Sequence, residues 1–354
     1  MQKRKKQIAH ERIQFFVSEV ALGFVLIFLL LLIPLFILPL FLESGSYLYG
    51  ILSYSFRAFI VFIGVPLILI LSNLLIRTQK RDLIIEEDIS PAKGHLNLYK
   101  ITKKNYQYQI LYGILLLFLV FIPLDFFTYV LIPGMLKYQS EALNYNSTNA
   151  YLGAGTNYII FLISVIIIQF SVAISEETIT RGLVSKRGSE HFFRMSAVII
   201  SALYFGLGHF AYFLNPISRS YPFWYPIVWF LQAFIIGIIL SLVVLRRNWL
   251  FPVILAHTLN NIISAHAVWN FSQGNDFADV ALFLYSPLLI VGVLLLIWQF
   301  RRIKESLSIG VKIFREYFKF DETREETSGD RIFRVFFDVI MAFLIFIMAI
   351  MIMI

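Results

Sequence analysis

Nine long apolar segments constrain the fold of this chain more than any other feature. They cover roughly residues 15–42, 48–76, 107–133, 156–178, 194–214, 223–245, 249–269, 279–299 and 333–354. A helix of about 20 apolar residues matches the hydrocarbon thickness of a bilayer. Since 59% of the 354 residues are hydrophobic and 15% are charged, the sequence predicts an all-α fold: a polytopic membrane helical bundle of about nine transmembrane helices.

The positions of the basic residues predict the orientation of the bundle. If all nine segments span the membrane, all but three of the 30 Lys and Arg residues lie on one side, the exceptions being Arg57, Lys137 and Arg219. Cytoplasmic loops carry an excess of Lys and Arg. We therefore expect a multi-pass protein of the cell membrane with a cytoplasmic N-terminus. The net charge of +8 then reflects this topology, because the basic residues of the loops face the anionic headgroups of the lipid bilayer. No motif indicates a nucleic-acid partner.

Ionisable side chains within the apolar segments are candidate functional residues, because an unpaired charge in the membrane costs several kcal/mol. The candidates that we single out are Asp125, Glu176, Glu177, Arg181, His209, His257, His266 and Asp338. The chain has no cysteine, so thiolate metal sites, cysteine nucleophiles and disulfides are excluded.

Two adjacent glutamates end the fourth segment. On a helix, residues four apart share a face, so Glu177 and Arg181 can form an ion pair. Glu176 points elsewhere and stays freer, as a general base requires. The alternative is a solvated charge cluster at a helix end.

The fifth and seventh segments each carry one further polar motif. Phe205 and His209 are four residues apart, and so are His257 and Asn261. Two polar side chains on one stripe of an apolar helix indicate a shared polar cavity. The alternatives are a hydrogen-bonded structural histidine and an interhelical hydrogen bond worth about 1 kcal/mol.

The three motifs together resemble those of a known family. E-E-x-x-x-R, F-x-x-x-H and H-x-x-x-N, in this order on separate helices, are similar to the motifs of the CAAX prenyl protease and bacteriocin-processing (CPBP) family. This family comprises intramembrane endopeptidases and includes the type II CAAX prenyl proteases. The resemblance covers roughly residues 150–300, and it implies an eight-helix family core with one helix added.

The resemblance implies hydrolysis of a peptide bond in a membrane-associated peptide or prenylated protein. Glu176 would activate water, His209 would hold or polarise it, and His257 with Asn261 would form an oxyanion hole. Glu177 and Arg181 would be supporting residues. The favoured mechanism requires no cofactor. A zinc ion bound by Glu176, His209 and His257 is the competing interpretation, because two histidines, a glutamate and a water can complete a tetrahedral site.

The same pattern suggests four parts. Residues 1–106 would form N-terminal transmembrane helices and a basic cytoplasmic loop, and residues 107–300 the protease core with the three motifs. Residues 301–332 would form an amphipathic and charged cytoplasmic segment, and residues 333–354 a C-terminal transmembrane helix. The alternative function is a non-catalytic membrane protein of the same fold, such as a bacteriocin immunity factor or a partner scaffold.

Overall fold

The computed structural model describes residues 2–79, 90–132, 134–144, 147–210, 221–318 and 326–353, and within these ranges every regular element is a helix. Seven helical stretches are long and apolar enough to cross a membrane. They are Arg4–Phe41, Tyr47–Leu74, Tyr106–Leu131, Tyr158–His191, Trp224–Arg247, Phe277–Trp298 and Ser328–Ile350. The chain is a multi-pass helical membrane protein, as the sequence predicts.

The other two predicted spans are also helices, but they do not meet both criteria. Helix α10 (Arg194–Gly208) is apolar but has only 15 residues, and residues 211–214 of that predicted span lie outside the described part. Helix α13 (Phe251–Ser272) has 22 residues, but its histidines and asparagines lower its hydropathy. These two helices carry the predicted histidine motifs.

The remaining elements follow in chain order. The N-terminal part contains α1 (Gln2–Phe15), η1 (Phe16–Ala21), α2 (Leu22–Phe41), α3 (Tyr47–Gln79) and α4 (Pro91–Asn97). The middle part contains α5 (Tyr106–Leu116), η2 (Leu117–Phe121), α6 (Ile122–Leu131), α7 (Met135–Asn144), η3 (Ser147–Leu152), α8 (Tyr158–Glu177), η4 (Thr178–Arg187), α9 (Gly188–His191) and α12 (Trp224–Arg247). The C-terminal part contains α14 (Phe277–Val280), η6 (Ala281–Tyr285), α15 (Ser286–Trp298), α16 (Phe300–Phe318) and α17 (Ser328–Met353).

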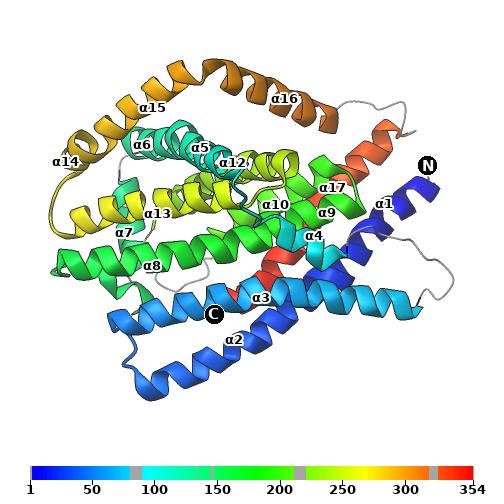
Figure 1. Cartoon of the computed structure of the whole chain (residues 1–354), viewed down its shortest axis with the longest axis horizontal. Coiled ribbons are helices and arrows are strands. Elements are labelled where there is room, and N and C mark those ends of the chain that lie inside the picture. Colours follow the sequence, from blue (N-terminus) through cyan, green and yellow to red (C-terminus); the bar gives the residue numbers. More distant parts are fainter. Residues whose placement is uncertain are drawn as a thin grey trace.

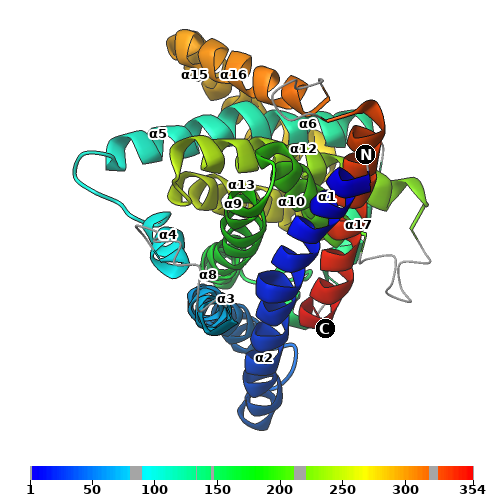
Figure 2. The same cartoon turned by 90° about the vertical axis from the view of Figure 1, so that its right-hand side faces the viewer.

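Helix α8 lies at the centre of the bundle. In both ribbon views it runs between α3 and α13 (Figures 1 and 2), and it packs against both. Its inner side chains Phe161, Val165 and Ile168 are at most 1% exposed. Its other side presents the exposed Ile159 and Ile163. One side of α8 is therefore packed in protein, while the other is suited to contact lipid chains.

The hairpin between α8 and α10 has a very short turn. The helix continues from α8 through η4 and α9 to His191, and α10 begins at Arg194. Glu176 lies 15 residues before His191, and His209 lies 15 residues after Arg194. Since the two helices run side by side from this turn, Glu176 and His209 lie at similar distances from it. The equal spacing therefore places the first two motifs at about the same depth in the membrane.

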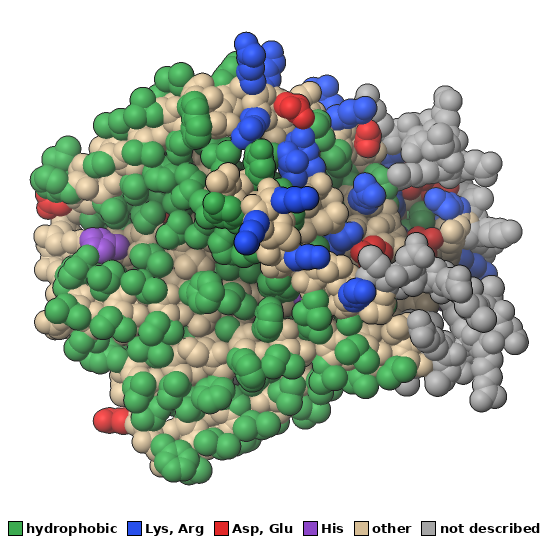
Figure 3. Space-filling view, in the orientation of Figure 1, with side chains coloured by type: hydrophobic (Ala, Val, Ile, Leu, Met, Phe, Trp, Pro, Cys, Tyr) green, Lys and Arg blue, Asp and Glu red, His purple; other side chains and the backbone are tan. Residues whose placement is uncertain are grey.

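The surface divides into an apolar and a basic end. On the face shown in Figure 3, Lys and Arg side chains gather toward the end at which α1 begins, while the opposite end is covered by hydrophobic side chains. The distribution has the asymmetry that the sequence predicts.

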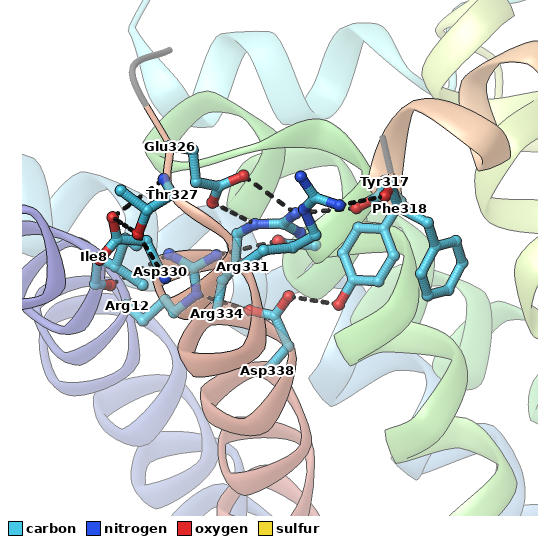
Figure 4. A network of polar contacts seen from close by, with 11 residues as sticks. Ile8, Arg12, Tyr317, Phe318, Glu326, Thr327, Asp330, Arg331, Arg334 and Asp338 are labelled. Carbon is cyan, nitrogen blue, oxygen red and sulfur yellow. Dashed lines mark hydrogen bonds and ion pairs between the residues drawn. The ribbon is translucent and has the colours of Figure 1, made fainter. Parts of the chain in front are cut away.

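A buried polar network joins the two ends of the chain (Figure 4). Nε of Arg12 in α1 lies 2.6 Å from Oδ1 of Asp338 in α17, and both side chains are almost fully buried. Asp338 also accepts a hydrogen bond from the hydroxyl of Tyr317 in α16, and Arg12 donates to the hydroxyl of Ser196 in α10. Asp338 therefore has a structural role, and α17 is anchored to the helix that leads to His209.

Candidate active site

The two glutamates of the first motif lie where the central helix changes its geometry. Helix α8 begins at Tyr158, directly after the N-cap residue Asn157, whose side chain accepts a hydrogen bond from the amide of Ile159. Beyond Glu177 the chain continues as the π-helix η4. Such wider turns are rare and occur often at functional sites. Tyr99 donates to, or accepts from, the hydroxyl of Thr178 at this junction, and burial raises the pKa of the Tyr99 phenol.

Glu177 and Arg181 form the predicted ion pair. Nε of Arg181 lies 3.1 Å from Oε2 of Glu177, and both side chains are 0% exposed. The guanidinium lies 4.2 Å from the centre of the Phe205 ring. A fully buried pair excludes the alternative of a solvated charge cluster at the helix end.

Glu177 also holds a histidine from another helix. Its Oε1 lies 2.7 Å from Nδ1 of His257 in α13. A carboxylate can only accept hydrogen bonds, so Nδ1 carries the proton. Nε2 of the same ring faces the other glutamate, with Oε2 of Glu176 at 3.8 Å. His257 therefore lies between the two carboxylates, and the fully buried Glu177 orients its ring.

Glu176 differs from its neighbour in its surroundings. Its side chain is 35% exposed, and its carboxylate makes no hydrogen bond to the residues that the structure describes. It lines a cavity of about 450 Å³ together with His257. The difference between the two glutamates agrees with the helical geometry expected from their spacing.

His209 and Asn261 line the same cavity. His209 follows the last residue of α10, and its Nδ1 lies 3.1 Å from the carbonyl oxygen of Phe205. A carbonyl cannot donate, so Nδ1 is the donor and neutral His209 has its lone pair on Nε2. All four predicted catalytic side chains thus face one cavity.

Aromatic rings enclose the imidazoles. The ring of Phe121 stacks on His257 with centres 6.1 Å apart, and Phe205 meets His257 edge-on at the same separation. Trp229 lies against His209, with ring centres 5.1 Å apart. These rings limit the rotation of both histidines and exclude lipid from the polar groups.

The predicted zinc ligands do not form a recognisable metal centre. Within the described ranges there is no group of three or more His, Cys, Asp or Glu side chains placed to hold a metal ion. Nδ1 of His257 is engaged by Glu177, which leaves Nε2 as the ring atom that could bind a metal. Glu176, His209 and His257 are not grouped as metal ligands in this arrangement, and no step below depends on a metal.

Other ionisable residues of the membrane segments have different surroundings. Ring nitrogen Nδ1 of His266 contacts the side chain of Asn270 one turn away, which is a structural arrangement. Asp125 accepts a hydrogen bond from Gln232 and lines the cavity.

Two cavity residues did not stand out in the sequence. Arg57 lies within α3, although the charge distribution assigned it to the outer side, and Tyr204 lies in α10. Both line the cavity. The sequence could have marked Arg57 as a candidate, because it is a charged residue inside the second apolar segment. Tyr204 could not have been found in this way, since a tyrosine in an apolar helix is not unusual.

The fold and this cavity define a polytopic helical membrane protein with a buried glutamate and histidine site. Residues 158–263 match the family model described as Type II CAAX prenyl endopeptidase Rce1-like. The match extends from α8 into α13 and includes all seven residues of the three motifs, which confirms the resemblance predicted from them. No curated protein and no solved structure matches the chain.

Proposed function

We propose that the protein is an intramembrane endopeptidase that hydrolyses a peptide bond of a membrane-associated substrate, with a prenylated CAAX peptide as the first candidate. The observation that carries the proposal is the position of His257 between Glu177, at 2.7 Å, and Glu176, at 3.8 Å, on the wall of one cavity. A scaffold protein needs no such arrangement of a freer carboxylate beside an oriented imidazole.

In this mechanism Glu176 is the general base. It takes a proton from a water molecule as the water oxygen attacks the carbonyl carbon of the peptide bond. His209, whose Nδ1 is held by a backbone carbonyl, accepts a hydrogen bond at Nε2 from the second O–H group of that water. The water is thereby oriented for attack before the proton transfer.

His257 and Asn261 stabilise the negative oxygen of the tetrahedral intermediate. The side-chain amide of Asn261 donates one hydrogen bond, and Nε2 of His257 donates another when the ring is an imidazolium. Glu177 stabilises this protonated form through its hydrogen bond to Nδ1. When the intermediate collapses, the C–N bond breaks and Glu176 returns its proton to the amine product.

Arg181 has a positioning role in this proposal. Its ion pair with Glu177 fixes the carboxylate that orients His257. Because the pair is fully buried, its geometry is not loosened by water.

The decisive experiment is a cleavage assay in liposomes with a farnesylated CAAX peptide, in which the wild type is compared with Glu176→Ala and His209→Ala. We expect both variants to lose about 10²- to 10⁴-fold in kcat while keeping their elution profile in detergent. Variants that cleave the peptide at the wild-type rate would show that the roles are wrong. A wild type that cleaves neither prenylated nor other membrane peptides would favour a non-catalytic protein.

The proposed orientation has a separate test. We propose that the basic end and the N-terminus face the cytoplasm. Because the chain has no cysteine, single-cysteine variants report cleanly. Ser90→Cys, at the start of α4, should be protected from an impermeant maleimide in intact cells, and Ser46→Cys, between α2 and α3, should react. The reverse result would invert the topology.

A further inference from the structure

Arg57 is a charged residue in the middle of a membrane-spanning helix. It belongs to the stretch Tyr47–Leu74, one of the seven that are apolar enough to cross a membrane. Charged side chains in such helices face the interior of the bundle or a cavity, and they mark substrate paths. Arg57 follows this rule, because it lines the cavity that contains Glu176.

The guanidinium of the half-buried Arg57 lacks the carboxylate partner that four other buried or half-buried arginines have. Arg12, Arg181, Arg187 and Arg334 each form an ion pair with a carboxylate at 3.1 Å or less. Across the described ranges, Arg57 has neither an ion pair nor a hydrogen bond, and its Nε is buried. A cation in a low-dielectric cavity is strongly stabilised by an anion. The cavity therefore presents an unused positive charge.

Tyr204 provides a second hydrogen-bond donor beside this charge. Its side chain lines the same cavity, and its hydroxyl has no hydrogen-bond partner among the described residues. Arg57 and Glu176 line this cavity as well, which places the three groups in one neighbourhood. The wall formed by α3 and α10 thus offers donors from two helices, and within the described ranges neither donor is hydrogen-bonded to Glu176 or to another residue.

We propose that Arg57 and Tyr204 bind a carboxylate of the substrate, and that its source is the free C-terminus of the peptide. The planar guanidinium matches the geometry of a carboxylate, and a phenol hydroxyl can complete its shell. The inference rests on the proposed peptidase function. It adds that Arg57 determines specificity, because it selects peptides whose cleaved bond lies close to their end.

The dimensions of a peptide are compatible with this assignment. An extended chain spans at most about 3.3–3.6 Å per residue, so a terminal carboxylate three residues from the cleaved bond lies within about 10 Å of it. A C-terminal CAAX sequence supplies a carboxylate at such a distance. An acidic side chain near the cleaved bond is the other source of the same chemistry.

Three peptides separate these sources in a cleavage assay. They are a farnesylated CAAX peptide with a free C-terminus, the same peptide as a C-terminal amide, and an amide whose last residue is glutamate. We expect the wild type to prefer the free acid over the first amide by about 10- to 100-fold in kcat/KM, the range of a charge-assisted hydrogen bond. If the third peptide restores the rate, an acidic side chain suffices.

Variants connect this preference to the two residues. Arg57→Met should cleave the acid and the amide at similar rates, with the loss on the acid residing mainly in KM. Tyr204→Phe should reduce the preference by a smaller factor. Lys137→Met is the matched control, because Lys137 is exposed and its nearest carboxylate is Glu141 at 3.9 Å; it should keep the full preference. A wild type that cleaves acid and amide equally, or an Arg57→Met variant that retains the preference, would overturn the proposal while leaving the peptidase function intact.

A binding measurement keeps the test independent of turnover and of misfolding. Peptide affinity is measured for Glu176→Gln and for Glu176→Gln combined with Arg57→Lys, which keeps the charge but loses the planar fork. The free acid should bind Glu176→Gln about 10-fold or more tightly than the amide, and the double variant should show a smaller difference. Equal affinity of the single variant for both peptides would refute the carboxylate site even if no peptide were cleaved.

Discussion

Nδ1 of His257 lies 2.7 Å from Oε1 of Glu177, although 80 residues separate them in the chain. The contact joins α13 to the end of α8 in the centre of the bundle. Because Glu177 is also paired with Arg181, its two oxygens serve different partners. Oε2 pairs with the guanidinium of Arg181, and Oε1 accepts the hydrogen bond that keeps the proton of His257 on Nδ1. The orientation of His257 is thus determined before any substrate binds.

Removal of the second oxyanion donor should slow the reaction with little effect on binding. We expect Asn261→Ala to reduce kcat by about 10²- to 10³-fold, as for other side-chain donors of this kind, with KM nearly unchanged. Asn270→Ala in the same helix is the control, because the side chain of Asn270 contacts His266 and Asn275 and is not among the residues that line the cavity. A normal kcat for Asn261→Ala would remove Asn261 from the mechanism.

Loss of one partner of the buried ion pair should destabilise the protein. Arg181→Met leaves Glu177 buried without its cation, and we expect a cost of about 3–5 kcal/mol, measured as a fall in Tm in detergent. Lys186→Met removes a more exposed pair with Glu190 and should cost less than about 1 kcal/mol.

The double variant Glu177→Gln/Arg181→Met tests the cause of that destabilisation. It should recover much of the Tm lost in Arg181→Met, because no uncompensated charge remains. Its activity should stay low, since a neutral amide supports the imidazolium of His257 poorly. Recovery of both properties would show that the pair has no part in catalysis.

Close packing of α10 against α12 should be sensitive to a single methyl group. A Cβ atom on Gly237 would lie 2.9 Å from Cα of Ala202, so the two helices would have to separate. We expect Gly237→Ala to cost about 1–3 kcal/mol and to lower kcat, because α10 leads to His209. Gly310→Ala meets its nearest atom at 3.9 Å and should leave Tm and kcat unchanged. Equal effects of the two substitutions would argue against the packing account.

His95 should make stability depend on pH. Burial lowers the pKa of His95 from 6.5 to about 4, so the unfolded chain takes up a proton at a higher pH than the folded protein. Above pH 6.5 the histidine is neutral in both states and has no effect. As the pH falls from 6.5 toward 4, the free energy of unfolding should decrease by up to about 3 kcal/mol.

The measurement is the Tm at pH 7.5 and at pH 5 for the wild type, His95→Phe and His10→Phe. His95→Phe keeps a ring against Gly182, where a Cβ atom would lie 2.6 Å from the imidazole, and it should flatten the pH dependence. His10 is exposed, and its substitution should leave the slope unchanged. An unchanged slope in His95→Phe would assign the effect to other groups.

Chelation should leave the activity intact. Since the described residues offer no group of three metal-binding side chains, we expect cleavage to continue in the presence of a membrane-permeant zinc chelator. The control is the same assay with added Zn²⁺. Complete loss of activity that zinc restores would contradict the metal-free mechanism and would support the set Glu176, His209 and His257.

The sequence predicts those parts of the site that depend on local geometry. Spacing of four residues predicts the Glu177–Arg181 pair, and the apolar segments predict the helices. The bond between Glu177 and His257 is not predictable in this way, because helix-to-helix contacts depend on the packing of the whole bundle. Arg57 shows a third case. Its charge is visible in the sequence, but its lack of a partner emerges only when all neighbouring helices are placed.

The buried pair of Arg12 and Asp338 has a consequence for biosynthesis. A ribosome makes the chain from its N-terminus, so Arg12 enters the bilayer 326 residues before the carboxylate that neutralises it. Until then the first helix has to keep this guanidinium near the headgroups or against a chaperone. Helix α17 supplies that carboxylate, so a nascent chain released before α17 is synthesised retains an uncompensated charge at Arg12.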